Sequence, residues 1–359
     1  MGGQHARSFA KMPEANLVAV ADISEQTAQK VAEETGARAF ADASSMLASG
    51  EIEAVLIATP HFFHAPVALD AASKGIHVLS EKPISVAAST ADEMIAACAT
   101  ANVLLGVMFQ QRTAPTRVKM KAMIEGGELG NLHRIAMAAP WYRTQAYYNS
   151  GAWRGTWKGE GGGILMNQAP HSLDQFVWLM GRPPKAVQAI CDTRLHSIEV
   201  ENLAVAICDY GDGVTGQFYA STSDVSSGER VEIIGDRGML SLDDRGLRFL
   251  ELETSLEEHL KTAKGGFETP KSAWRDIPTG GEHQSHADVT AAFARAIRAN
   301  DASLMVAGGK DGRDALELAN AILMAGYKRR EVTLPLDRAE FDAMLLSLQE
   351  GATPASLRA

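Results

Sequence analysis

Glu81 and Lys82 form a charged pair in the run SEKPIS, directly after an apolar stretch that is typical of a strand. A lysine at such a strand end can hydrogen-bond a substrate hydroxyl and stabilise negative charge that develops on its oxygen. A pair of solvated surface charges is the alternative interpretation.

A second group of chemically capable residues lies in the run EGGGILMNQAPHSLDQFVWLMG, which ends at Gly181. Asn167 and His171 are four residues apart, and His171 and Asp174 are three apart, so a helix would place all three on one face. A polar stripe in an otherwise apolar helix needs hydrogen-bond partners or a function. A lone histidine would more often be a satisfied core residue, but the glycine-rich approach favours the functional interpretation.

The elements that must position Lys82 follow a βαβ pattern, which predicts an α/β fold with a Rossmann-type, doubly wound parallel sheet over residues 1–114. The pattern predicts strands at 17–22, 37–42, 53–60, 77–83 and 104–109, and helices at 24–35, 63–74 and 88–101. Ligands bind at the carboxyl ends of such strands. We therefore expect Thr59, Pro60, His64, Glu81 and Lys82 to contact a cofactor; a surface position at a helix N-terminus is the alternative for His64.

In the rest of the chain, 115–359, strand-like runs of alternating apolar and polar residues are separated by turn residues. This pattern predicts an α/β domain with an open, mostly antiparallel sheet. Helices are expected at 115–125 and 171–180, and a loop at 253–282. Helices within 285–330 are expected to pack back toward the Rossmann domain. An uncovered apolar sheet face favours a homo-oligomer.

The opening MGGQHARSF predicts the second half of a dinucleotide fingerprint, with Gly2 and Gly3 at the cofactor. Asp22 then ends the next strand, where its carboxylate can bind a ribose diol and repel a 2′-phosphate. No Arg or Lys follows at 23–28, so NAD is favoured over NADP. The first strand would lie upstream of Met1, and we expect an N-terminally truncated chain with weakened folding and cofactor binding. An ordinary N-terminus that contains glycines is the alternative.

The composition excludes several classes of protein. The net charge of -10 disfavours nucleic-acid binding, and no apolar run is long enough to span a membrane. The three cysteines show no metal-ligand or disulfide spacing. We expect a cytoplasmic protein without a metal site.

The chain resembles the Gfo/Idh/MocA oxidoreductases in VAVAD, ATPHFFH, SEKPIS, GELGNLHRI, WRGTWKGEGGGILMNQAPHSLDQFVWLMG, EIIGDRGML and LPLD. The combination of EKP with a downstream GGG…H..D is specific. The resemblance implies bound NAD(P) and hydride transfer at a sugar or cyclitol carbon, with Lys82 contacting substrate and His171 as general acid/base. Many members carry Asp where this chain has Asn167, so a proton relay there is lost and hydrogen bonding remains. Asp174 could orient His171.

The NQ…H variant looks like the sugar and nucleotide-sugar dehydrogenases of that family. Five residues lie in segments that resemble substrate loops, and packing of the sheet edge is their alternative role: Arg112, Tyr142, Tyr148, Trp153 and Arg154. The sequence leaves two further functions open, an NAD-assisted glycosidase and a non-catalytic sugar or nucleotide sensor.

Overall fold

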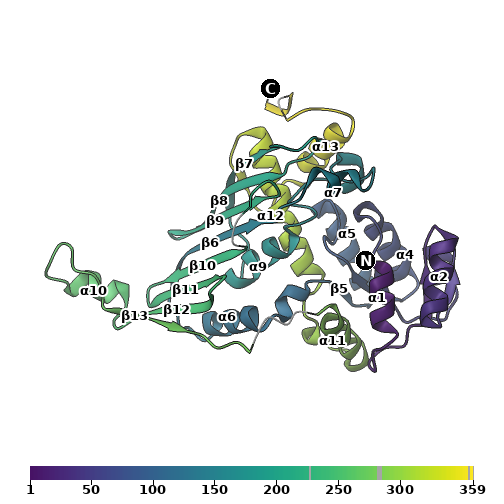
Figure 1. Cartoon of the computed structure of the whole chain (residues 1–359), viewed down its shortest axis with the longest axis horizontal. Coiled ribbons are helices and arrows are strands. Elements are labelled where there is room, and N and C mark those ends of the chain that lie inside the picture. The colour runs from purple at the N-terminus through teal and green to yellow at the C-terminus, as the bar shows by residue number, and fades with distance from the viewer. Residues whose placement is uncertain (226–227, 281–284, 355, 359) are drawn as a thin grey trace. The chain divides into compact units, whose positions relative to one another are not determined.

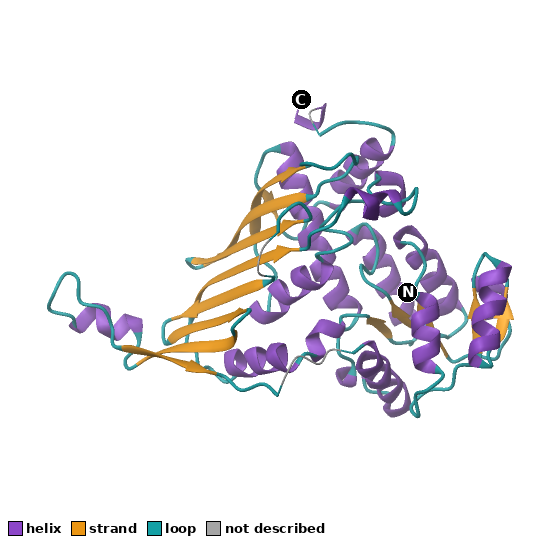
Figure 2. Ribbon diagram, viewed as in Figure 1, coloured by secondary structure: helices purple, strands orange, loops and turns teal. Residues whose placement is uncertain are grey.

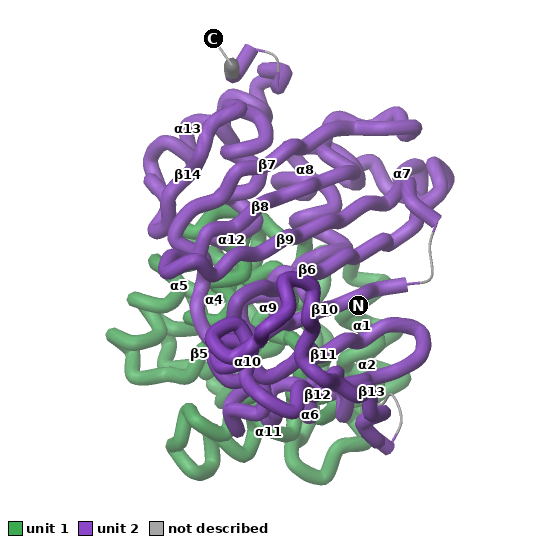
Figure 3. The backbone as a smooth tube through the Cα atoms, turned by 90° about the vertical axis from the view of Figure 1, so that its left-hand side faces the viewer, with its two compact units in different colours: residues 1–113, 284–316 green, residues 114–283, 317–359 purple. Residues whose placement is uncertain are grey.

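Five parallel strands and their helices form the N-terminal part of the computed structural model, which describes residues 1–225, 228–280, 285–354 and 356–358. By internal contacts the chain divides into two units, 1–113 with 284–316 and 114–283 with 317–359 (Figure 3). The division falls inside helix α12 (Gly309–Lys328). Of the predicted helical segment 285–330, only the part up to 316 therefore belongs with the first unit.

The first unit contains two separate parallel sheets, β1–β2 and β3–β4–β5 (Figures 1 and 2). Among the described residues no strand is hydrogen-bonded between β1 and β3. The strands are β1 (Ala19–Ala21), β2 (Arg38–Phe40), β3 (Ala54–Ile57), β4 (His77–Ser80) and β5 (Leu105–Val107). The helices are α1 (Gly2–Phe9), α2 (Glu25–Thr35), α3 (Ala43–Leu47), α4 (His64–Ser73), α5 (Ala88–Thr100) and α11 (His286–Ala299), with short 3-10 turns η1 (His61–Phe63), η2 (Gln110–Thr113) and η3 (Ala302–Leu304).

The core of the first unit joins β4 and β5 to α11. Leu79, Met108, Val289 and Phe293 form one buried cluster. Gly106 of β5 lies against this cluster, since an added Cβ would come 3.0 Å from the Phe293 ring. The apolar positions of α11, spaced three and four residues apart, thus explain why this late segment packs on the parallel sheet.

The second unit is built on one nine-stranded sheet with the order β13-β12-β11-β10-β6-β9-β8-β7-β14. Every neighbouring pair is antiparallel except β6 with β9. The strands are β6 (Leu132–Pro140), β7 (Ala186–Asp192), β8 (Leu203–Gly211), β9 (Val214–Ser221), β10 (Arg230–Gly235), β11 (Gly238–Asp243), β12 (Gly246–Leu252), β13 (Ser272–Asp276) and β14 (Val332–Thr333). The expected fold, a Rossmann unit plus an α/β domain with a mostly antiparallel sheet, is confirmed.

Helices cover one face of the large sheet (Figure 2). Phe176 of α9 packs edge-on against Phe218 of β9 at 5.6 Å between ring centroids, and Gly326 of α12 lies against Cys191 of β7. This unit contains α6 (Pro115–Glu125), α7 (Gln145–Asn149), α8 (Trp157–Glu160), α9 (Pro170–Met180), α10 (Leu256–Thr262), α13 (Arg338–Gln349), the later part of α12 and the short turn η4 (Ser356–Arg358).

The opposite face of the sheet exposes apolar side chains. Ile190 of β7 pairs with Val205 of β8, and Ile207 lies two residues further along β8. All three are exposed, Ile207 to 61%. Alternation of buried and exposed residues from Ala204 to Tyr210 of β8 places Val205 and Ile207 in this row.

The segment 253–282 is not simply a loop, contrary to the sequence prediction. It contains α10, capped by Ser255, and β13, whose five residues are all exposed and which pairs with β12 at the edge of the sheet. We call 253–276 the arm, because α10 projects beyond the sheet (Figure 1).

Three cysteines are buried as free thiols. Burial raises the pKa of Cys98 to about 11 and that of Cys208 to about 12, and it raises the pKa of Cys191 as well. Among the described residues no helix is both long and apolar enough to cross a membrane.

Candidate active site

The glycine pair of the N-terminus lies in the first turn of α1, with Met1 as N-cap, and not in a loop that precedes a helix. An added Cβ at Gly3 would come 3.4 Å from Cγ2 of Val31 on α2, so the glycine permits close helix packing. The N–H groups of a first helical turn lack intrahelical partners and can bind an anion.

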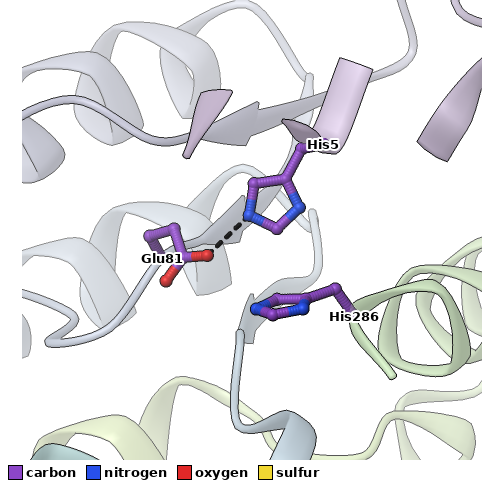
Figure 4. A group of neighbouring side chains, drawn as sticks. All are labelled: His5, Glu81 and His286. Carbon is purple, nitrogen blue, oxygen red and sulfur yellow. Dashed lines mark hydrogen bonds and ion pairs between the residues drawn. The ribbon is translucent and has the colours of Figure 1, made fainter. Parts of the chain in front are cut away.

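His5, Glu81 and His286 come together from α1, the end of β4 and the start of α11 (Figure 4). His5 Nε2 lies 2.6 Å from Glu81 Oε1, and the two imidazole rings meet edge-on at 5.1 Å. The other carboxylate oxygen of Glu81 accepts a hydrogen bond from the Lys82 backbone N–H at 3.1 Å. His5 thus holds the carboxylate that in turn contacts the backbone of Lys82.

These three side chains offer metal-ligand atoms within 4.8 Å of one another. Two ligands of a tetrahedral zinc ion are about 3.3 Å apart, whereas His5 Nε2 and Glu81 Oε1 are at hydrogen-bond distance. His286 is the first residue of α11, and the positive end of a helix opposes a cation. The arrangement fits a hydrogen-bonded cluster better than a cation site.

Glu81 is ionised despite its burial. Burial by itself raises the pKa of Glu81, but the hydrogen bond and charge of His5, together with the charge of Lys82, outweigh that effect and lower it to about 2. Lys82 therefore follows a fixed negative charge at the end of β4.

His64 is buried and links two strand-end loops instead of lying on the surface. Nε2 is 2.8 Å from the carbonyl oxygen of Thr59, and Nδ1 is 2.9 Å from that of Pro83. Burial lowers the pKa of His64, and a neutral imidazole donates to only one of these carbonyls. We interpret His64 as a structural link that holds the Thr59–Pro60 loop next to the EKP loop, residues 81–83.

Two other predicted residues of the first unit differ in exposure. Asp22 is exposed just after β1, and its Oδ1 accepts a hydrogen bond from the backbone N–H of Ser24. Arg112 is buried, and it donates to the carbonyl of Val306 and to Asp311. These contacts agree with the structural alternative for Arg112, and its role toward a substrate stays a prediction.

The glycine run of the second unit is held by Glu201, which is fully buried. Its Oε1 accepts hydrogen bonds from the backbone N–H groups of Gly163 at 3.0 Å and Leu165 at 3.1 Å. An added Cβ at Gly163 would lie 1.7 Å from the Glu201 carbonyl oxygen, which only glycine permits.

His171 and Asp174 lie on α9, one turn apart, and both are buried. Asn167 lies in a turn before Pro170, so the prediction that all three share one helix is wrong for Asn167. Its side-chain amide donates to the carboxylate of Glu160. Helix α9 is anchored by Ser172, whose hydroxyl donates to Glu229 at 2.6 Å.

The other four predicted substrate-loop residues belong to the second unit and have different surroundings. Arg154 stacks on the rings of Tyr147 and Trp153 at 4.4 and 4.3 Å, and its guanidinium donates to the Tyr147 hydroxyl at 2.6 Å. Tyr148 is buried and its hydroxyl bonds to Thr222. Tyr142 is half exposed. Tyr147, which the sequence does not single out, therefore contacts Arg154.

Four residues of the second unit are not predicted from the sequence: Glu160, Glu201, Tyr147 and Gln168. Gln168 donates to the Tyr147 hydroxyl at 3.2 Å. Of these four residues, Glu160 alone has a sequence feature that could have drawn attention to it, because it is a charged residue directly before a glycine run.

Two family models match the chain. The model "Oxidoreductase family, NAD-binding Rossmann fold" matches residues 1–109, and the model "GFO/IDH/MocA C-terminal domain" matches residues 118–241. The chain therefore belongs to the Gfo/Idh/MocA family of NAD-binding oxidoreductases.

Relatives of this family are similar at low identity. Rhizopine catabolism protein MocA of Rhizobium meliloti is 26% identical over 74% of this chain and 84% of its own. Inositol 2-dehydrogenase of Rubrobacter xylanophilus is 37% identical over 50% of this chain and 49% of its own. The structure of the WlbA dehydrogenase from Bordetella pertussis in complex with NADH and UDP-GlcNAcA is 27% identical, with a TM-score of 0.77 over 93% of this chain and 95% of that one.

Proposed function

We propose that this chain is an NAD-dependent dehydrogenase that acts on a ring hydroxyl of a sugar, a nucleotide sugar or a cyclitol. The observation that carries the proposal is that both predicted catalytic side chains follow fixed segments. Lys82 follows the buried, ionised Glu81, which accepts a hydrogen bond from the Lys82 backbone N–H. His171 lies on a helix that follows the glycine loop held by Glu201. The named activities of the inositol dehydrogenases and the nucleotide-sugar acid bound to WlbA support the substrate class.

The residues of the first unit fit a dinucleotide. Gly2 and Gly3 lie in the first turn of α1, where unpaired N–H groups can bind a phosphate, and the exposed Asp22 suits a ribose diol. Gly2, Gly3, Asp22, Thr59 and Pro60 would hold NAD in preference to NADP. Bound NAD supplies the acceptor for the hydride.

Residues of the chain accept the hydroxyl proton and stabilise the negative charge on the hydroxyl oxygen. The imidazole of His171 takes the proton of the ring hydroxyl as the carbon loses its hydride, and Asp174 orients that imidazole. The Lys82 ammonium stabilises the negative charge on the hydroxyl oxygen during the transfer. Asn167 hydrogen-bonds the substrate but cannot accept a proton.

A screen of hexoses, inositols and nucleotide sugars for NAD reduction tests the proposal. We expect His171→Ala to lower kcat by about 10²- to 10⁴-fold, the usual contribution of a general base. His259→Ala, on the exposed arm, is the matched control and should keep the wild-type rate. Equal rates in both variants would contradict the role of His171.

Glycoside cleavage and sugar binding, measured beside NAD reduction, separate the other functions. An NAD-assisted glycosidase would cleave a glycoside without net NADH, and a sensor would bind sugar without turnover. Either result would replace the dehydrogenase proposal.

We also propose that the exposed row of Ile190, Val205 and Ile207 is the face through which the chain forms a homo-oligomer. Contiguous apolar surface of this kind favours association.

A further inference from the structure

Glu160 is a buried carboxylate at the end of α8, with 1% of its surface exposed. Helix α8 is a single turn that begins after Thr156 and ends at Gly161, which adopts a left-handed conformation with φ 76°. The carboxylate therefore lies directly before the glycine run that leads to Asn167 and His171.

Both oxygens of Glu160 accept hydrogen bonds from residues of predicted substrate segments. Oε2 accepts from the backbone N–H of Gly155 at 2.5 Å, next to Arg154. Oε1 accepts from the side-chain amide of Asn167. One buried carboxylate thus ties the segment that carries Trp153 and Arg154 to the turn that carries Asn167.

The contact decides which way the Asn167 amide faces. An asparagine side chain has a donor end and an acceptor end, whereas a carboxylate only accepts. The NH2 group of Asn167 must therefore face Glu160, which directs the carbonyl Oδ1 to the other end of the planar amide, away from that contact. Without a fixed acceptor beside it, an amide could turn either end toward a ligand.

We infer that Glu160 is a positioning residue that makes Asn167 a hydrogen-bond acceptor for a substrate hydroxyl. The inference rests on the proposed function. It also gives a physical account of the departure from the family pattern. The neutral Asn167 offers an acceptor oxygen, as an aspartate would, and the negative charge lies one side chain further back, on Glu160.

A reciprocal pair of substitutions tests this. In Glu160→Gln the new amide can accept from Gly155 and donate to Asn167, which then turns its NH2 toward the substrate. In Asn167→Asp two carboxylates face each other, so one must hold a proton and the pH profile of kcat/KM should shift upward. Each single variant should lose about 10- to 100-fold in kcat/KM.

In the double variant, Glu160→Gln with Asn167→Asp, the hydrogen bond between the two side chains runs in the opposite direction, from the new amide to the new carboxylate. Position 167 again presents an acceptor oxygen to the substrate, and the pair again carries one negative charge. We expect the double variant to recover most of the lost kcat/KM, to return the pH profile toward wild type, and to melt at a higher temperature than either single variant. Gln168→Glu, one residue along, is the control, and it should not be rescued by Glu160→Gln.

The inference would be overturned if the two losses in kcat/KM simply added in the double variant, or if Glu160→Gln kept the wild-type kcat/KM. Absence of turnover in the wild-type protein would refute the proposed function and with it the assignment toward a substrate hydroxyl. The melting temperatures of the four proteins would still report whether Glu160 and Asn167 are paired, so the two failures are distinguishable.

Discussion

Glu201 shows how a single buried side chain can make folding depend on pH. Burial raises the pKa of Glu201 from its ordinary value of 4.5 to about 7, although the N–H groups of Leu165 and Gly163 act in the opposite direction. One oxygen accepts from both N–H groups, so the protonated form keeps the glycine loop in place.

The folded protein therefore holds a proton on Glu201 that the unfolded chain releases between pH 4.5 and 7. The contribution of this group to stability is complete below pH 4.5 and is lost as the pH rises through 7. Over 2.5 pKa units it amounts to about 3 kcal/mol.

We expect Glu201→Gln, which is neutral at every pH, to flatten the dependence of the free energy of unfolding between pH 5 and 7.5. Chemical unfolding of both proteins at several pH values measures this. Parallel curves for wild type and variant would show that Glu201 stays ionised in the fold.

The places of Lys82 after a strand and of His171 on a helix that follows the glycine run could be predicted from the sequence, because the residue types and their spacing are local. Their chemical roles stay predictions. The contact of Glu201 could not be predicted, because it reaches Gly163 from 38 residues away. The sequence could not reveal that Arg112 donates to Asp311 or that the Tyr148 hydroxyl bonds to Thr222. The role of both residues toward a substrate stays a prediction.

At the scale of elements, the loop before α9 depends on the absence of one side chain. The Cβ of an alanine at position 163 would overlap the Glu201 carbonyl oxygen, so the backbone would have to move. We expect Gly163→Ala to lower the free energy of unfolding by more than about 2 kcal/mol and to abolish most activity, because the loop positions Asn167 and His171.

Thermal unfolding and kcat/KM measure the effect. Gly266→Ala is the control, since no atom lies within 4 Å of an added Cβ at that position of the arm. A loss as large in Gly266→Ala would mean that the effect does not arise from the contact with Glu201.

The helices that pack on a sheet were predictable, since α5 and α6 have the apolar spacing and bounds expected from the sequence. The arm was not, because β13 buries no face and so shows no alternation of apolar and polar residues. Its order comes from pairing with β12, a contact that no local pattern encodes.

At the scale of the whole molecule, the exposed row on the large sheet predicts self-association. We expect Ile207→Lys to shift the protein toward the monomer, because a charge in the centre of an apolar contact must be desolvated. Size-exclusion chromatography with light scattering measures the mass. Leu346→Lys, at a similarly exposed apolar position on α13, should leave the mass unchanged. A wild-type protein that is already monomeric would contradict the proposed oligomer.

Cys98, Cys191 and Cys208 react through their thiolate forms, and burial suppresses those forms in all three. Maleimides and mild oxidants should consequently leave the native protein untouched. A single cysteine introduced at Phe267, which is fully exposed on the arm, would then be the only position to take a fluorophore, with no need to remove the natural thiols.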